Sequence, residues 1–272
     1  MEIRALSWNL YHGRDFPPDR SLLTMRSRLF GASTRNATHV QVNRDLEPEF
    51  AHVLWGSGWD VALLQEAPPH WAEGLAEACG AGRHRALTSR NWISSLRIFV
   101  ARHRPDLIAS NEGGSNLTLV RPAAGAIVER REAVLKPGPS PERRVMAFTR
   151  TANGLAIANL HASTADPFAV EELLIAAQAA EDWSGGGPLI FGGDFNVRPR
   201  DEEIYEQLAD EYGLRGVTAD DAIDHLLVRG LQVVAAPHAL SAERREVFDS
   251  ASGLAVRLSD HSPVAAVFQR RQ

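Results

Sequence analysis

The segment LIFGGDFNVRP, residues 189–199, places a run of apolar and small residues before an acid and an amide, and then ends at a proline. A short apolar run bounded by turn signals predicts a fully buried strand. Asp194 and Asn196 are two residues apart, so both point to the same side if the chain stays extended. The glycines Gly192 and Gly193 would let the backbone approach a substrate closely. We therefore expect a central strand whose tip carries polar groups.

The first part of the chain alternates between strand and helix patterns. IRALSW (3–8) and DVALLQE (60–66) are apolar on both faces, as buried strands are. DLEPEFAHVLW (45–55) lies between them and has a helical pattern. PPHWAEGLAEAC (68–79) starts with prolines and continues with helix formers, which predicts a second helix with Cys79 buried on it.

The middle of the chain predicts antiparallel sheet. Five strand-like pieces follow one another: LRIFVA (96–101), NLTLVRP (116–122), AIVERREAVL (126–135), RRVMAFTRT (143–151) and LAIANLH (155–161). Asn153-Gly154 between the last two favours a hairpin with a type I′ turn, since both turn positions need positive φ. KPGPSPERR (136–144) is typical of a surface loop.

Besides the strand at the start of LIFGGDFNVRP, residues 165–272 contain two further helix patterns and three strand patterns. ADPFAVEELLIAAQAAEDW (165–183) predicts a helix that Asp166 caps, and DEEIYEQLADEYG (201–213) predicts one that stops at Gly213. The strand patterns are AIDHLLVRG (222–230), LQVVAA (231–236) and HSPVAAVF (261–268). No linker divides the chain, so we predict a single domain of class α/β (α+β) over residues 1–272, with a long surface excursion from Tyr11 to Asp45.

Composition narrows the function classes. The net charge of −5 disfavours a protein held to nucleic acid by bulk positive charge. Cys79 is the only cysteine, which excludes an intramolecular disulfide and a thiolate zinc cluster. No segment has the length and apolar character of a membrane span. We expect a cytoplasmic protein with no membrane span and no obligate protein partner.

Polar side chains recur at the ends of the apolar strands. Each one alone has an ordinary explanation, because Asn and Asp often close turns and a histidine can be satisfied in a half-buried site. Together they repeat the free-energy cost of placing a polar or charged group beside the apolar core, which pairing or metal binding would offset. The set comprises Asn9, Glu66, His161, Asp194, Asn196, Asp224, Asp260 and His261.

The chemistry of this set indicates phosphoester hydrolysis. Glu66, Asp260 and Asn9 are oxygen donors of the kind that Mg²⁺ or Mn²⁺ prefers. The remaining acids, the amide and the two histidines supply bases, donors and charge partners for an attacking water and an anionic centre.

An ordered series of motifs then resembles a known group. It consists of WN (8–9), LLQE (63–66), NLH (159–161), GGDFN (192–196), IDH (223–225) and SDHSP (259–263). This series is similar to that of the endonuclease/exonuclease/phosphatase superfamily of deoxyribonuclease-I-like phosphoesterases. The resemblance implies a four-layer α/β/β/α sandwich, in which two mixed β-sheets pack face to face, helices cover both outer faces, and the site lies at one edge.

The resemblance also implies roles, position by position. Glu66 would be the principal ligand of a Mg²⁺ or Mn²⁺ ion, with Asn9 and Asp260 beside it. Asp194 would orient or deprotonate the attacking water, and Asn196 would hold a phosphate oxygen. His261 would contact the scissile phosphate with Asp224 behind it, and His161 would donate to the phosphate or to the leaving group.

Three more positions are candidate substrate contacts. Asn116 matches a mid-chain asparagine of many relatives, although the LTLV that follows it differs from their usual sequence. The alternative is that Asn116 is a turn residue at the edge of a strand. His12 and Arg14 follow Asn9 closely enough to touch a phosphate, and a solvated loop is the competing interpretation. No tyrosine lies near NLH, which disfavours the abasic-endonuclease branch.

The sequence therefore predicts a divalent-metal-dependent hydrolase of phosphodiester bonds, with DNA or RNA favoured as substrate. Phospholipids, inositol phosphates and other small phosphoesters are the alternative. A binding module without catalysis would be expected to lack an equivalent of Glu66, Asp194 or His261, and none is missing. A two-carboxylate glycosidase would explain Glu66 and Asp194 but not Asn196 or the histidines.

Overall fold

The computed structural model describes residues 1–24, 32–88, 114–135, 144–164, 168–201 and 203–270. The predicted strand at 96–101, the predicted cap at Asp166 and most of the loop at 136–144 lie outside these residues. No helix among the described residues has both the length and the apolar character needed to cross a bilayer.

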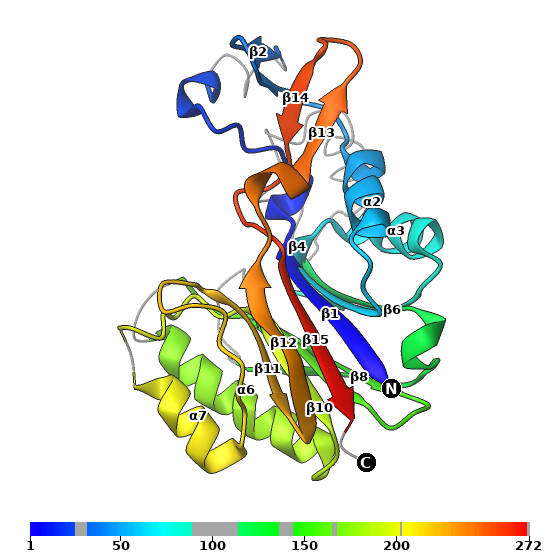
Figure 1. Ribbon diagram of the computed structural model, residues 1–272, viewed down its shortest axis with the longest axis vertical. Coiled ribbons are helices and arrows are strands. Elements are labelled where there is room, and N and C mark those ends of the chain that lie inside the picture. Colours follow the sequence, from blue (N-terminus) through cyan, green and yellow to red (C-terminus); the bar gives the residue numbers. More distant parts are fainter. Residues whose placement is uncertain (25–31, 89–113, 136–143, 165–167, 202, 271–272) are drawn as a thin grey trace.

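Two mixed sheets form the body of the protein (Figure 1), as predicted. The six-stranded sheet has the order β12 (Leu231–Ala239), β15 (Val264–Arg270), β1 (Glu2–Asn9), β4 (Val61–Ala67), β6 (Ser115–Val120) and β5 (Gly82–Leu87). The five-stranded sheet has the order β11 (Asp224–Arg229), β10 (Leu189–Asp194), β9 (Ala156–His161), β8 (Val145–Thr151) and β7 (Ile127–Val134). Each sheet contains one parallel pair, β1 with β4 and β9 with β10, and its other neighbours are antiparallel.

Side chains that alternate along these strands point either into a core between the two sheets or toward the helices that cover the outer faces. Ile3, Leu63, Ile157 and Ile190 belong to a cluster that joins the two sheets. Burial of each such side chain contributes about 1.5–3 kcal/mol. Both sheets are therefore apolar on the face that they share.

Helices pack against the other face of each sheet. The helices α2 (Glu47–Gly56) and α3 (Ala72–Cys79) share a core cluster with outward side chains of β1 and β4. The helices α6 (Phe168–Ser184) and α7 (Ile204–Tyr212) do the same for β9 and β10. Gly213 ends α7 with a φ of 65°, as predicted, and Cys79 is buried. Short 3₁₀ turns are η1 (Tyr11–Gly13), η2 (Arg20–Leu22), η3 (Pro69–Trp71), η4 (Pro122–Ala124) and η5 (Ala242–Arg245).

The hairpin between β8 and β9 is present, but its predicted type I′ turn is not. Thr151 O accepts a hydrogen bond from Gly154 N at 2.8 Å, and Thr151 N donates to Leu155 O at 3.0 Å. Gly154 has a positive φ of 73°, and Asn153 does not share it. This geometry is a three-residue loop with glycine in the left-handed position, which joins antiparallel strands as well as a two-residue turn does.

The described part of the region predicted as a surface excursion contains more regular structure than expected. Its strands β2 (Thr34–Arg35) and β3 (Val40–Gln41) pair, and the hairpin of β13 (Glu246–Asp249) and β14 (Leu254–Arg257) lies beside them. His39 forms a bridge with Ala255 and an ion pair with Glu246 at 3.0 Å. We call residues 11–24 and 32–43 together with β13 and β14 the upper extension; it projects beyond the two sheets at the top of Figure 1.

His84 on β5 provides a pH test of this fold. Burial, aided by the charge of Arg130, lowers the pKa of His84 from 6.5 to about 4. The unfolded chain therefore binds the proton more readily, so the stability that neutral His84 contributes is complete above pH 6.5 and is lost as the pH falls toward 4. We expect the free energy of unfolding to fall by at most about 2 kcal/mol from this group between pH 7 and pH 5.

Chemical denaturation at the two pH values measures this change. A His84→Gln variant should show a smaller loss of stability than the wild type over the same interval. Equal losses in the two proteins would contradict the burial of a neutral imidazole at this position.

Candidate active site

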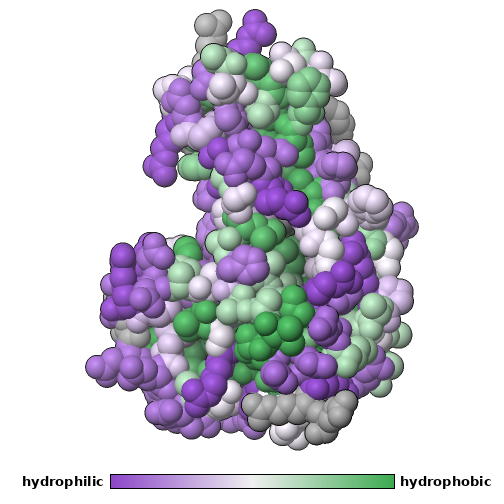
Figure 2. Space-filling view, viewed as in Figure 1, coloured by the Kyte–Doolittle hydropathy of each residue, from purple (hydrophilic) through white to green (hydrophobic). Residues whose placement is uncertain are grey.

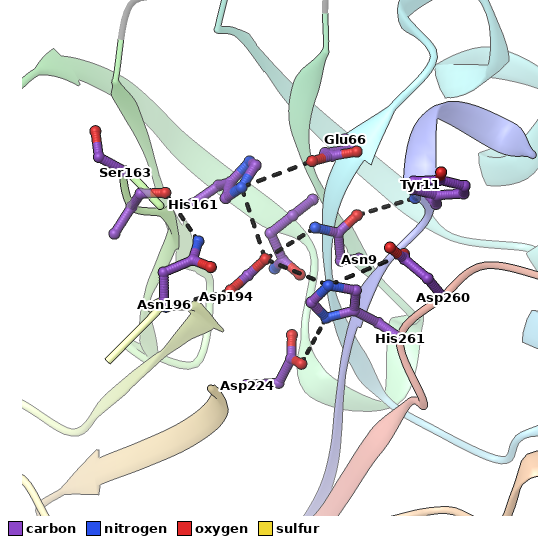
Figure 3. Close-up of polar contacts among 12 residues, drawn as sticks. Asn9, Tyr11, Glu66, His161, Ser163, Asp194, Asn196, Asp224, Asp260 and His261 are labelled. Carbon is purple, nitrogen blue, oxygen red and sulfur yellow. Dashed lines mark hydrogen bonds and ion pairs between the residues drawn. The ribbon is translucent and has the colours of Figure 1, made fainter. Parts of the chain in front are cut away.

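The polar side chains predicted at strand ends meet at one edge of the two sheets (Figure 3). Asn9, Glu66, His161 and Asp194 lie at or next to the last residue of β1, β4, β9 and β10. Asp224 instead begins β11, and His261 precedes β15. Because β11 is antiparallel to β10 and β15 is antiparallel to β1, the beginnings of those strands reach the same edge.

One oxygen atom, Oδ2 of Asp194, lies at the centre of this cluster. Asn9 Nδ2 donates to it at 2.9 Å, and the Nε2 atoms of His161 and His261 lie 3.6 Å and 3.9 Å away. The Asp194 side chain is 2% exposed. Burial, together with the charge of Asp224, raises the pKa of Asp194. Asp194 is therefore a buried carboxyl group surrounded by nitrogen donors.

His261 is held by a carboxylate behind it. Its Nδ1 forms a hydrogen bond with Oδ2 of Asp224 at 2.7 Å. Burial opposes protonation of His261, but the hydrogen bond and the charge of Asp224 outweigh it and raise the pKa of His261 to about 10. The ring is thus oriented with Nε2 toward Asp194 and available as a charged donor.

Glu66 lies between two histidines. His12 Nε2 is 3.1 Å from Glu66 Oε2, and His161 Nε2 is 3.7 Å from Glu66 Oε1. Burial would raise the pKa of Glu66, but the charge of His12 and a hydrogen bond from Asn9 are among the causes that lower it overall. Burial also lowers the pKa of His161 to about 3, which leaves that imidazole neutral near pH 7. Glu66 is therefore ionised. His161 is a neutral imidazole, whose Nε2 either accepts or donates a hydrogen bond according to the tautomer.

The carboxylates of Glu66 and Asp260 and the amide of Asn9 form an oxygen-rich group that suits a hard cation. Burial and the negative charge of Glu66 are among the causes that raise the pKa of Asp260, so the two acids repel each other. A cation between them would relieve that repulsion. Asn9 Oδ1 accepts from Tyr11 N at 2.9 Å and keeps a second lone pair for a ligand.

Asp194, Asp224 and His261 also bring donor atoms within 4.8 Å of one another. The 2.7 Å hydrogen bond between His261 and Asp224 accounts for much of that proximity. A protonated imidazole has no lone pair for a metal ion, so the residues fit a cation better at Glu66.

The geometry of the GGDFN segment differs from the extended form expected for it. Asn196 has a φ of 54°, its N–H donates to Asp194 Oδ1 at 3.3 Å, and its Nδ2 donates to Ala162 O at 3.1 Å. Neighbouring strands occupy the place where a side chain would begin at each of the two glycines. A Cβ at Gly193 would overlap the carbonyl oxygen of Leu160, and one at Gly192 would lie 2.8 Å from His225 O. The glycines therefore allow neighbouring strands to pack closely.

The three expected substrate contacts lie in different surroundings. Arg14 stacks on the Tyr11 ring with its Cζ 3.9 Å from the centroid, and its charge acts on Asp260. His12 contacts Glu66 directly. Asn116 is completely buried, and its Nδ2 donates to Val145 O at 2.7 Å across the two sheets. Because Asn116 has no accessible surface, the expectation that it touches substrate does not fit its position.

Two residues that the sequence interpretation did not single out support this edge. Ser259 Oγ donates to Asn9 O at 2.6 Å and accepts from His261 N at 3.0 Å. Trp8 Nε1 donates to His261 O at 2.9 Å. Both residues belong to the WN and SDH motifs, so a signal was present for each. They join the end of β1 to the loop that carries Asp260 and His261.

Comparisons with known proteins agree with this geometry. The profile of the Endonuclease/Exonuclease/phosphatase family matches residues 6–261. A comparison with curated protein sequences finds no significant match.

Solved structures of low sequence identity share the fold. An endonuclease/exonuclease/phosphatase family protein from Bacteroides thetaiotaomicron is 17% identical with a TM-score of 0.65, covering 100% of this chain and 99% of that one. A mannosyl-6-phosphatase from the same organism is 17% identical with a TM-score of 0.64, covering 98% and 99%. Truncated TDP2 from Caenorhabditis elegans is 12% identical with a TM-score of 0.55, covering 99% and 98%.

Proposed function

Because this chain belongs to the endonuclease/exonuclease/phosphatase family, whose members are typically hydrolases of phosphoesters, we propose that it hydrolyses phosphodiester bonds with a bound divalent cation. The observation that carries the proposal is the environment of Asp194 Oδ2, which faces nitrogen atoms of Asn9, His161 and His261. A carboxylate so surrounded can orient a water molecule, and the nitrogen donors can stabilise an anionic phosphate beside it.

We propose Glu66, Asp260 and Asn9 as the cation-binding residues, with Mg²⁺ or Mn²⁺ as the ion. A cation bound there would neutralise charge that develops on a phosphate oxygen. His12, in contact with Glu66, would orient the Glu66 carboxylate. Arg14 would bind a phosphate oxygen from the side of Asp260.

The remaining residues would act on the phosphate and on the water. Asp194 accepts the proton of the attacking water or holds that water in line with the scissile bond. His261 donates from Nε2 to a phosphate oxygen while Asp224 fixes its tautomer at Nδ1. Asn196 donates to a second phosphate oxygen after its Nδ2 leaves Ala162 O, and His161 donates to the phosphate or to the leaving oxygen.

Nucleic acid is the substrate that we favour, because His161 matches the position that the deoxyribonuclease-like branches use. A phosphomonoester is the second candidate, since a mannosyl-6-phosphatase matches the fold over nearly the whole length of both chains. A metal-supplemented panel of duplex DNA, single-stranded DNA, RNA, choline phospholipid, inositol phosphates and mannose 6-phosphate separates these classes by the product released.

Removal of the cation tests the proposal. Hydrolysis of bis(4-nitrophenyl) phosphate by the purified protein with Mg²⁺ or Mn²⁺ should fall at least about tenfold in EDTA and return when the metal is restored in excess. Release of 4-nitrophenolate measures the rate. Full activity in EDTA would overturn the metal assignment.

A pair of variants locates the ion. Glu66→Gln should raise the Mg²⁺ concentration needed for half-maximal activity, because the ligand loses its charge. Glu77→Gln, on the exposed face of α3, is the matched control and should leave that concentration unchanged. Equal metal requirements in the two variants would place the cation elsewhere.

A further inference from the structure

The surface beside the catalytic cluster is hollowed, and residues far apart in the sequence form its walls. The pocket has a volume of about 780 Å³. Phe16 and Arg20 of the upper extension line one side, and Asp224 and His261 lie in the wall. The other side is lined by Arg198, Thr218, Ala219 and residues 221–223. We call this pocket the notch. Figure 2 shows the surface indented on the left, between the upper extension and the lower body.

Hydrogen bonds and a buried neighbour hold the backbone at Arg20 in place. Arg20 begins η2, where Asp19 Oδ1 accepts from Ser21 N at 3.0 Å and Leu22 is buried. Phe16 N donates to Arg257 O at 2.7 Å, which ties the same wall to β14. The Arg20 guanidinium lies over the Phe16 ring with its Cζ 5.4 Å from the centroid.

The backbone at Arg198, on the opposite wall, is held in the same way. The preceding residue, Val197, is buried, and its carbonyl oxygen accepts from Tyr205 Oη at 2.8 Å. The Arg198 carbonyl accepts from Asp201 N at 3.1 Å. Among the residues that the structure describes, neither Arg20 nor Arg198 forms an ion pair with a carboxylate, and both are exposed.

The charges that line the notch do not cancel. Asp224 is bonded to His261, and Asp260 belongs to the proposed cation site. Asp221 is then the remaining acid among the described lining residues, against the two guanidinium groups. Arginine presents a planar fork of donors that matches phosphate oxygens, and exposed charge next to a phosphate site attracts further negative charge.

We propose that the notch binds a second phosphate group of the substrate, held by Arg20 and Arg198 while the scissile phosphate lies at Asp194 and His261; this inference rests on the proposed function. The substrate is then a phosphoester that carries at least two phosphates. An oligonucleotide strand and an inositol polyphosphate both supply that chemistry, whereas a sugar monophosphate does not.

Matched pairs of substrates test the inference. One pair is the 4-nitrophenyl ester of thymidine 5′-phosphate with and without a 3′-phosphate. The other is inositol 1,4-bisphosphate against inositol 1-phosphate. In at least one pair, kcat/KM of the wild type should be roughly tenfold or more higher for the compound with two phosphates, as a charge-assisted contact supplies. The pair that shows the preference identifies the source, and no preference in either pair overturns the inference.

Arginine variants assign the preference to the notch. Arg198→Gln and Arg20→Gln should each reduce the ratio of kcat/KM values toward 1, and Arg198→Lys should retain part of it. Arg131→Gln, an exposed arginine on β7 outside the notch, is the control and should keep the wild-type ratio. A preference that survives both glutamine variants would overturn the assignment. Thermal melts confirm that the variants are folded.

Binding without turnover separates the two proposals. If the wild type hydrolyses none of these compounds, the proposed function fails. Titration calorimetry in EDTA then decides whether the notch binds a second phosphate group. Inorganic pyrophosphate should bind more tightly than orthophosphate, and Arg198→Gln should remove most of that difference. Equal binding of the two anions would overturn the inference regardless of activity.

Discussion

Replacement of Asp194 by asparagine is expected to lower kcat for phosphodiester hydrolysis by about a thousandfold or more. Asp194 Oδ2 faces Asn9, His161 and His261, so its charge and its capacity to accept a proton act on the proposed water position. The amide of asparagine keeps the shape of the carboxylate and still accepts the Asn9 hydrogen bond, but it is not a base. Initial rates at saturating substrate and metal measure the change.

The same substitution should not destabilise the protein. A buried carboxylate next to Asp224 is costly, and its neutral replacement removes that cost. The melting temperature of Asp194→Asn is therefore expected to equal or exceed that of the wild type. Asp210→Asn, exposed on α7, is the matched control for both measurements. A kcat within tenfold of the wild type would remove Asp194 from the reaction, and a large fall in melting temperature would make the loss structural.

Much of the fold could be predicted because its signals are local. Buried strands such as β4 and β10 are short apolar runs, and α7 carries both its periodicity and its terminal Gly213 in one stretch of sequence. The strand β5 was missed because GRHRAL is an edge strand that exposes its arginines, so no apolar run marks it. The hairpin of β13 and β14 was missed because its bridge partner, His39, lies more than 200 residues away from Ala255.

Most of the polar side chains that meet at this edge could be predicted, but the backbone that positions them could not. Glu66, Asn196 and Ser259 all have positive φ values near 50°. Residues other than glycine adopt that conformation rarely, and surrounding structure must impose it. The sequence also contained no sign that Asp224 and His261 reach the site from the beginnings of antiparallel strands. That arrangement depends on the pairing of β10 with β11 and of β1 with β15.

The same dependence on strand pairing makes Gly193 the position where one methyl group should do most damage to the fold. Gly193 lies opposite Leu160 in the parallel pair of β9 and β10, directly before the register position that sets Asp194 beside His161. Its φ is 142°, a conformation that side chains rarely adopt, and an added Cβ would overlap the Leu160 carbonyl oxygen. Gly193→Ala therefore combines backbone strain with overpacking, and we expect it to cost about 3–5 kcal/mol of unfolding free energy.

Gly186→Ala isolates the backbone part of that effect. Gly186 also has a positive φ, 83°, but no atom of the described residues lies within 4 Å of the place that an added methyl group would occupy, so its substitution should cost only about 1 kcal/mol. Urea denaturation of both variants gives the difference directly. If the strands separate to accept the Gly193 methyl group, His161 moves away from Asp194, and the folded fraction of Gly193→Ala should also lose activity. Costs that agree within about 1 kcal/mol would mean that the close approach of β9 and β10 does not hold this edge together.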